Sequence, residues 1–326
     1  MSTHPGPSAR LAPWLVVAML AMVAVPAAIT LNTVKHPATL TISEANPTPY
    51  GYTLSLLLFI VPIVVIGFWF VPKEGVVIPR KAFWRTIAIL VPGGFALDFF
   101  FAGHFFVFPN VGATLQIGAP ALGKPVPIEE YVFYLTGFIV VLLLYVWMDE
   151  FWLAAYNVPD YKGEAKQISR LLQFHPASAM VAIALIAAGI IYKKFFSSSP
   201  EGFPGYFTFL VGVGIMPAVT FFPAARRFVN WRAFSATSFF ILLVSLLWEA
   251  TLALPYGWWG FQSRQMLGLS IGAWSGLPIE EVFVWIAVTY ATVIVFEVVK
   301  IWQASEKPAR VALLGEKSKA TAAAQR

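Results

Sequence analysis

Apolar residues run in long stretches along most of this chain, and polar residues gather between them. A helix of about twenty apolar residues crosses a hydrocarbon core roughly 30 Å thick. The stretches do not alternate in polarity over about ten residues, as strands crossing a bilayer do. We therefore predict an all-α integral membrane protein with about eight transmembrane helices, at residues 11–31, 51–71, 84–108, 128–148, 177–196, 205–222, 233–255 and 278–302.

The sequence also allows predictions about the segments at the two ends of the chain. Arg10 precedes the first stretch, which ends in Val25-Pro26-Ala27-Ala28 and so resembles a secretory signal peptide with its cleavage site. Because the run to Leu31 is long enough to span the membrane, we favour a membrane span; a cleaved signal over residues 1–28 is the alternative. Residues 303–326 are polar and Ala-rich, which predicts a disordered cytoplasmic tail.

Composition agrees with a membrane protein and excludes several kinds of site. Of the 326 residues, 59% are hydrophobic and 12% are charged, whereas a soluble domain is about 45–50% apolar and 25% charged. The chain has no cysteine, which excludes disulfides and thiolate-bound metals or clusters. His104 and His175 are isolated, without metal-ligand spacing, so we expect neither a metal site nor a cofactor.

The net charge of +6 comes from the loops and reports orientation. Most Lys and Arg residues lie near the termini or in alternate loops, and the exceptions are Lys35, Lys124, Lys193, Lys194 and Arg264. By the positive-inside rule, both termini are predicted to be cytoplasmic. We expect a multi-pass protein of the cell membrane in contact with lipids, and no affinity for nucleic acid.

The chain contains an internal repeat. Pro127-Ile128-Glu129-Glu130 recurs unchanged as Pro278-Ile279-Glu280-Glu281, at an offset of 151 residues. The same offset places Asp98 on Glu249, and both acids lie inside apolar spans. Each half has four predicted spans, an even number, so both halves insert with the same orientation. We predict two parallel four-helix repeats, residues 1–150 and 151–302, related by a pseudo-two-fold axis along the membrane normal.

The acids within the spans are the first candidates for function, because such acids usually face a bundle interior or cavity. Two effects compete at the Glu pairs: a helix N-terminus stabilises a carboxylate, whereas apolar surroundings favour the neutral acid. Adjacent glutamates differ by about 100° around a helix, so only one of each pair can point directly into a given pocket.

Aromatic side chains accompany these acids at helical spacing or in the loop after the seventh span. The candidates for substrate contact are Phe105, Tyr134, Tyr256, Trp258, Trp259 and Trp285. A neutral carboxyl can donate a proton to an olefin, and a carboxylate can remove one. An aromatic face stabilises an intervening cation by roughly 0.5–2 kcal/mol. The pattern therefore suits acid/base chemistry on an unsaturated hydrocarbon.

Structural interpretations compete with each assignment. The outward-facing glutamate of each pair is a helix cap in the alternative reading, and Asp98 or Glu249 bridges helices. Trp and Tyr near span ends commonly anchor a protein at the membrane interface. Glu297 and Lys300 are expected to form a local surface pair.

The duplicated Pro-Ile-Glu-Glu motif resembles the integral-membrane lycopene cyclases, found as paired or fused small subunits in bacteria, archaea and fungi. The likeness covers roughly residues 80–150 and 230–300 and also includes Asp98, Glu249, Trp258-Trp259-Gly260 and Phe283. It implies cofactor-independent cyclisation of the acyclic ends of lycopene, or a related carotenoid, to β-ionone rings. On this resemblance, the proton-handling set is Glu129, Glu130, Glu280 and Glu281, supported by Asp98 and Glu249. Eight spans exceed the compact fused form, and spans one and five are the expected additions.

Other classes of membrane protein fit less well. A flavin-dependent cyclase needs a G-x-G-x-x-G turn, which is absent from the sequence. A prenyltransferase needs aspartate clusters for Mg²⁺–diphosphate, and the spans contain only Asp98. An intramembrane metalloprotease with paired glutamates needs an arginine four residues on, where this chain has Tyr134 and Trp285. A proton-coupled transporter, or a lipid- or carotenoid-binding protein, stays the alternative, because repeats with midplane acids also suit transport.

Overall fold

The computed structural model describes residues 48–158 and 161–316 of the chain. Within these ranges, six helices are long and apolar enough to cross a membrane: Gly51–Lys73, Arg80–Phe105, Ile128–Trp152, Pro176–Phe195, Trp231–Ala253 and Glu280–Ala304. They coincide with predicted spans two, three, four, five, seven and eight. Predicted span six corresponds to a shorter apolar helix, Gly205–Phe221. Predicted span one, with its signal-peptide alternative, lies outside the described residues.

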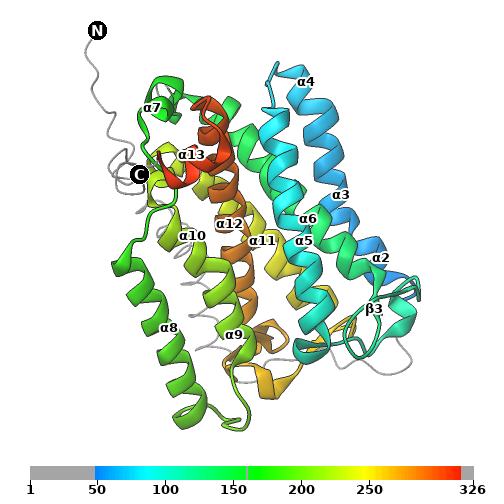
Figure 1. Cartoon of the computed structure of the whole chain (residues 1–326). Coiled ribbons are helices and arrows are strands. Elements are labelled where there is room, and N and C mark those ends of the chain that lie inside the picture. The colour runs from blue at the N-terminus through cyan, green and yellow to red at the C-terminus, as the bar shows by residue number, and fades with distance from the viewer. Residues whose placement is uncertain (1–47, 159–160, 317–326) are drawn as a thin grey trace.

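Figure 1 shows the arrangement of the helices, and several of these spans contain π-helical turns. Their elements are α2 (Gly51–Ser55), α3 (Leu57–Val64), η1 (Val65–Phe70) and α4 (Val71–Lys73); α5 (Arg80–Phe105); α6 (Ile128–Trp147) and η3 (Met148–Trp152); α8 (Pro176–Phe195); α9 (Gly205–Phe209), η5 (Leu210–Ile215) and α10 (Met216–Phe221); α11 (Trp231–Trp248) and η7 (Glu249–Ala253); and α12 (Glu280–Ala304). Pro62 lies inside α3 just before η1. Proline donates no backbone hydrogen bond, so a wider turn re-pairs the chain there.

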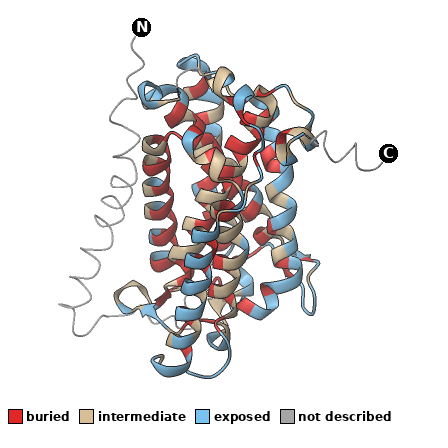
Figure 2. Ribbon diagram, turned by 60° about the vertical axis from the view of Figure 1, so that its left-hand side comes forward, coloured by how far each residue is buried: buried red, intermediate tan, exposed pale blue. Residues whose placement is uncertain are grey.

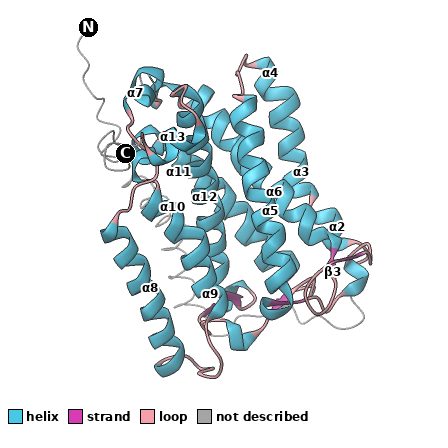
Figure 3. Ribbon diagram, viewed as in Figure 1, coloured by secondary structure: helices cyan, strands magenta, loops and turns pink. Residues whose placement is uncertain are grey.

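Short elements connect the spans. The helical ones are η2 (Val111–Ala113), η4 (Ala154–Tyr156), α7 (Tyr161–Gln167), η6 (Pro223–Phe228), η8 (Ser263–Gln265), η9 (Gly272–Trp274) and α13 (Ala309–Leu314). The strands are β1 (Phe106–Val107), β2 (Gly118–Ala119), β3 (Val126–Pro127), β4 (Gly260–Phe261), β5 (Ser270–Ile271) and β6 (Leu277–Pro278). Figure 3 shows the strands gathered at one end of the bundle.

The helix α12 lies at the centre of the bundle. It packs against α5, α6, α11 and η5, while α3 covers α6 and α8 covers α10. More than half of the apolar window is buried in the spans that contain α6, α11 and α12, but less than a third in those of α3, α5 and α8. Figure 2 shows helices that are mostly buried beside helices with a largely exposed face. The outer helices thus leave apolar surface for lipid, as expected of a membrane protein.

The secondary structure recurs at the offset found in the sequence. The helices α5 and α11 begin at Arg80 and Trp231, which are 151 residues apart, and the strands β3 and β6 end at Pro127 and Pro278. In each half the strand pairs antiparallel with its neighbour, β2 with β3 and β5 with β6. The strands β1 and β4 pair with each other, in the register Phe106 opposite Phe261, and so join the two halves. The pseudo-two-fold relation itself stays a prediction.

The predicted division of the loops between two ends agrees with the structure. Figure 1 places α4, α7 and α13 at one end, together with most of the basic loops, and the strand-bearing loops at the other. The cytoplasmic side stays a prediction.

The prediction of a disordered tail from residue 303 is wrong for residues 303–316, because α12 continues to Ala304 and α13 follows. Leu171 N donates to Ala312 O at 2.9 Å, which pins α13 to the loop after α7; residues 317–326 lie outside the described residues.

Candidate active site

The first glutamate of each pair holds a connecting loop. Glu129 Oε1 accepts hydrogen bonds from Leu115 N at 2.7 Å and from Thr53 Oγ1 at 2.5 Å. Its equivalent, Glu280, accepts from Leu267 N at 2.5 Å. Both carboxyl groups are buried. The capping interpretation is therefore wrong for Glu129 and Glu280, because both face inward and accept hydrogen bonds from loop backbone, and neither α6 nor α12 has a side-chain cap.

The second glutamate of each pair lines a cavity shared by the two halves. Glu130 from α6 and Glu281 from α12 meet there, together with Glu249 from η7. Neither Glu129 nor Glu280 lines this cavity, so the expectation that one member of each pair points into a given pocket is confirmed. The volume is about 40 Å³, and the other lining residues are Tyr52, Phe106, Phe108, Phe133, Tyr134, Tyr206, Trp248, Trp259 and Val284. We call this space the acid cavity.

Asp98 and Glu249 occupy equivalent helices but differ in their surroundings. Glu249 begins the π-helical η7, lines the acid cavity, and accepts a hydrogen bond from Trp285 Nε1 at 2.8 Å. Its carboxyl also neighbours that of Glu281. Asp98 is fully buried behind the cavity wall near Glu130, and neither of its oxygens has a hydrogen-bond partner. The two acids therefore stand behind or beside the second glutamates, but only Glu249 reaches the cavity.

The aromatic residues expected to contact substrate divide into three groups. Tyr134 and Trp259 line the acid cavity. Trp285 stands behind it, where it holds Glu249 and stacks on Phe59 at 5.9 Å between ring centroids. The others lie away from the cavity: Phe105 packs in a cluster with Tyr206 and Leu210, and Tyr256 and Trp258 line a lateral groove.

Several residues that line the acid cavity were not predicted from the sequence. Tyr52 and Tyr206 contribute hydroxyl groups, and Trp248, Phe106, Phe108 and Phe133 contribute rings. A signal for the tyrosines exists, because Gly51-Tyr52 and Gly205-Tyr206 open the second and sixth spans. They are 154 residues apart, so a search at the main offset of 151 misses them.

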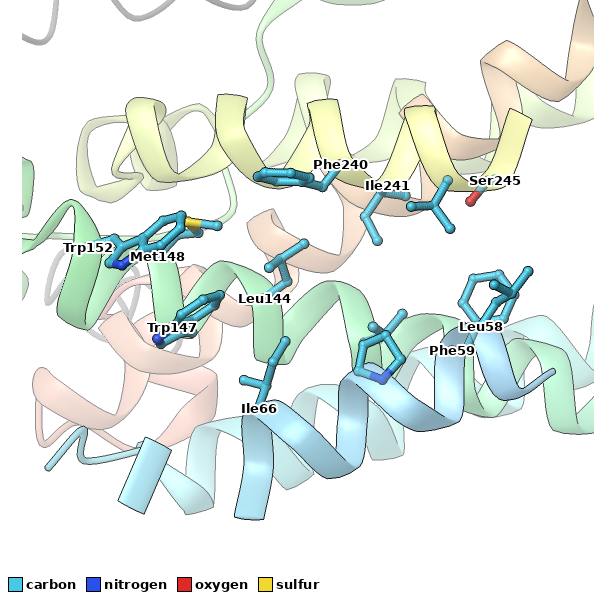
Figure 4. Close-up of a pocket in the computed structure, with 13 residues that line it drawn as sticks. Leu58, Phe59, Ile66, Leu144, Trp147, Met148, Trp152, Phe240, Ile241 and Ser245 are labelled. Carbon is cyan, nitrogen blue, oxygen red and sulfur yellow. The ribbon is translucent and has the colours of Figure 1, made fainter. Parts of the chain in front are cut away.

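Two apolar spaces lie along the side of the bundle, outside the acid cavity. A cavity of about 240 Å³ lies between α3, α6 and α11; its lining includes Phe59, Leu144, Trp147 and Ile241, and Ser245 is its single polar side chain (Figure 4). A groove of about 860 Å³ continues from it past Leu58 and Pro62 to Tyr256 and Trp258. Phe59, which lines the cavity of about 240 Å³, packs against Trp248, which lines the acid cavity, at 5.4 Å between ring centroids, so these two rings separate the two cavities.

A second buried charged cluster lies at the opposite end of the bundle. Glu297 is fully buried and accepts from Tyr161 Oη at 3.0 Å, Tyr145 Oη at 3.1 Å and Lys300 Nζ at 3.3 Å. Lys300 also pairs with Asp149 at 3.6 Å. The expectation of a local surface pair is therefore wrong, because η3 and α7 cover both residues. Burial, together with the nearby Glu297 carboxylate, raises the pKa of Tyr161.

Comparisons with known proteins do not assign the chain to a family. No family model matches the chain, and neither the curated proteins nor the solved structures compared with it give a match. Among the described residues, no group of three or more His, Asp or Glu side chains is placed to hold a metal ion. The acid cavity is therefore interpreted from its own geometry.

Proposed function

We propose that the chain is a cofactor-independent carotenoid cyclase, an isomerase that closes the acyclic ends of a lycopene-type polyene to β-ionone rings. One observation carries the proposal: Glu130, Glu249 and Glu281, drawn from both halves, share one cavity walled by aromatic rings. An alkene is protonated by a neutral carboxyl, and the resulting cation is stabilised by ring faces.

The reaction balances with these residues alone. A protonated carboxyl forms a C–H bond at the terminal double bond of the polyene and becomes a carboxylate. The internal double bond attacks the cation and forms the ring C–C bond. A carboxylate then takes a proton from the ring, which forms the new double bond and leaves this acceptor as a neutral acid; the proton passes back to the donor before the next turnover. No net proton enters or leaves, so neither a gradient nor a nucleotide is required.

In this proposal, both halves contribute residues to the cyclisation of one polyene end. Because Glu130 and Glu281 border the same space, the donor and the acceptor for a single polyene end come from different halves in this proposal. Glu249 stands beside Glu281 and serves as the reserve site for its proton. Aromatic faces of Tyr52, Trp248 and Trp259 then surround the cation.

The cavity is smaller than the end group it would process, so binding must widen it. About 40 Å³ holds a single small molecule such as water. The Phe59 and Trp248 rings separate it from the lateral cavity along α3. In the proposal, movement of these rings admits the polyene end, and the remaining chain lies in the apolar lateral groove.

Pigment analysis of a lycopene-accumulating bacterial host tests the proposal. The wild-type chain is expected to convert lycopene to a mono- or bicyclic carotene, and the Glu130→Gln/Glu281→Gln double variant is expected to leave lycopene unchanged. A matched control is Glu74→Gln/Glu306→Gln, at two exposed glutamates. Unchanged lycopene with the wild-type chain, despite confirmed membrane insertion, would overturn the proposal.

Purified protein in detergent separates an isomerase from a transporter. A cyclase forms product there, without a membrane or a gradient. A proton-coupled transporter instead moves its solute into vesicles only when a proton gradient is present, and forms no product. Gradient-dependent uptake without isomerisation would place the transporter alternative first.

A further inference from the structure

Two tyrosines hold equivalent places beside the second glutamates. Tyr52, in the first turn of α2, is buried and donates a hydrogen bond from Oη to Glu130 Oε1 at 2.5 Å. Tyr206, in the first turn of α9, is equally buried and lines the acid cavity together with Glu281. Tyr52 lines the same cavity. Each half therefore supplies one tyrosine for one cavity glutamate.

The local sequence explains how both hydroxyl groups reach the cavity. A glycine precedes each tyrosine, Gly51 and Gly205. A Cβ on Gly51 would lie 2.7 Å from the Trp258 ring, and one on Gly205 would clash with the Gln265 side chain. Because glycine has no Cβ, both turns can approach their neighbouring loops closely.

Ring packing leaves each tyrosine little freedom. The Tyr52 ring lies 4.9 Å from Trp259 and 6.3 Å from Trp248, between centroids. The Tyr206 ring lies 5.0 Å from Phe105 and 5.2 Å from Phe106. Aromatic contacts of this kind hold a ring in one orientation. The hydroxyl direction is therefore fixed by the fold before any substrate binds.

We propose that Tyr52 and Tyr206 are positioning residues for Glu130 and Glu281. In this role, each hydroxyl donates to one carboxyl oxygen and so reserves the other oxygen for proton exchange with the hydrocarbon. The hydroxyl also replaces the water that would otherwise solvate a carboxylate after it has given up its proton. This inference rests on the proposed function, and it names the residues that direct the proton in each half.

Kinetics of purified Tyr52→Phe and Tyr206→Phe variants test the inference. Phenylalanine keeps the ring contacts and removes only the hydroxyl. We expect kcat to fall about 10–100-fold in each variant, which is the effect of losing one hydrogen bond to a charged group, with KM within about twofold of wild type. The matched control is Tyr131→Phe, which removes the hydroxyl that donates to Pro120 O at 2.6 Å, outside the cavity; its kcat should stay unchanged.

Two outcomes overturn the inference. One is a kcat within twofold of wild type in both variants. The other is a rise in KM with kcat unchanged, which is the signature of a substrate contact alone. Replacement of Tyr52 by fluorotyrosine, which keeps a hydroxyl donor, should restore most of the lost kcat, and failure to do so also counts against positioning.

A chemical readout separates this inference from the proposed function. A hydrophobic carbodiimide modifies protonated carboxyl groups in membranes, and mass spectrometry locates the modified residue. We expect Tyr52→Phe to change the rate of Glu130 modification severalfold, and Tyr131→Phe to leave it unaltered. A changed rate in a chain that converts no polyene would retain the positioning role and discard the cyclase, whereas an unchanged rate overturns the positioning role.

Discussion

The carboxylate of Asp149 and the ammonium group of Lys300 form a salt bridge at 3.6 Å, and their positions differ by the repeat offset of 151 residues. Equivalent positions of two related halves meet only near the axis that relates them. The ends of α6 and α12 therefore approach the predicted pseudo-two-fold axis at this end of the bundle. Toward the other end of the same two helices, Glu130 and Glu281 border the acid cavity. Residues of the two halves therefore meet both at the salt bridge and at the acid cavity.

Removal of the Lys300 charge should destabilise the bundle. Lys300→Met leaves the buried carboxyl groups of Asp149 and Glu297 without their cation. Breaking one partner of a buried pair costs about 3–5 kcal/mol, so the thermal unfolding midpoint in detergent should fall by several degrees. The control is Lys166→Met, which breaks the exposed pair with Glu306 at 3.0 Å and should change stability by less than about 1 kcal/mol. Equal midpoints for the two variants would contradict the account of this cluster.

Replacement by glutamine should be tolerated at the first glutamate of each Glu pair but not at the second. The amide oxygen of Gln at position 129 or 280 still accepts the hydrogen bonds from Leu115 N or Leu267 N. Glu129→Gln and Glu280→Gln should therefore keep kcat within about threefold of wild type, whereas Glu130→Gln should lose more than about 100-fold, as expected when a general acid or base is removed. Turnover of purified variants decides this, and a loss in Glu129→Gln as large as that in Glu130→Gln would restore all four glutamates as proton carriers.

The indole of Trp285 should matter to catalysis through its hydrogen bond to Glu249. Trp285→Phe keeps a ring beside Phe59 but removes the donor at 2.8 Å. We expect kcat to fall about tenfold, because a hydrogen bond to a charged group contributes about 1.5–3 kcal/mol. Trp302→Phe is the control, since that indole donates to Lys307 O at the opposite end. A similar change in kcat for both variants would assign Trp285 a packing role only.

Two neighbouring glycines of α5 should respond in opposite ways to alanine. A Cβ on Gly94 would lie 2.8 Å from the Tyr134 ring, whereas a Cβ on Gly93 would meet nothing within 4 Å. Gly94→Ala should lower stability by about 1–3 kcal/mol through overpacking, and Gly93→Ala should leave it equal or raise it by up to about 1 kcal/mol through helix propensity. Thermal unfolding in detergent measures both. A stable Gly94→Ala variant would mean that α5 packs less tightly on α6 than described.

The sequence was sufficient for features that depend on local pattern. Apolar runs located the spans within the described residues, because span length follows from the thickness of the hydrocarbon core. The duplicated tetrapeptide singled out Glu130 and Glu281, which border the acid cavity, and the offset added Glu249; Asp98, at the equivalent position, does not reach the cavity.

Features that depend on tertiary packing could not be predicted from the sequence. The second and sixth spans are shifted by three residues relative to the main offset, which hid Tyr52 and Tyr206. Glu297 and Lys300 are close in sequence and looked like a surface pair, but their burial arises from η3 and α7, far from them along the chain. The different roles within each Glu pair depend on loop backbone at Leu115 and Leu267, whose path no local pattern predicts.

In the proposed mechanism both halves act on one polyene end in a single cavity, and single-glutamate variants distinguish this arrangement from two independent sites. Pigment analysis of lycopene-accumulating cells with Glu130→Gln alone and Glu281→Gln alone should show almost no cyclic carotene in either case, because each variant lacks one of two proton-handling groups of the same site. If each half instead contains an independent site, each single variant will keep about half of the wild-type activity, and only the double variant will be inactive. That second result would contradict the shared site.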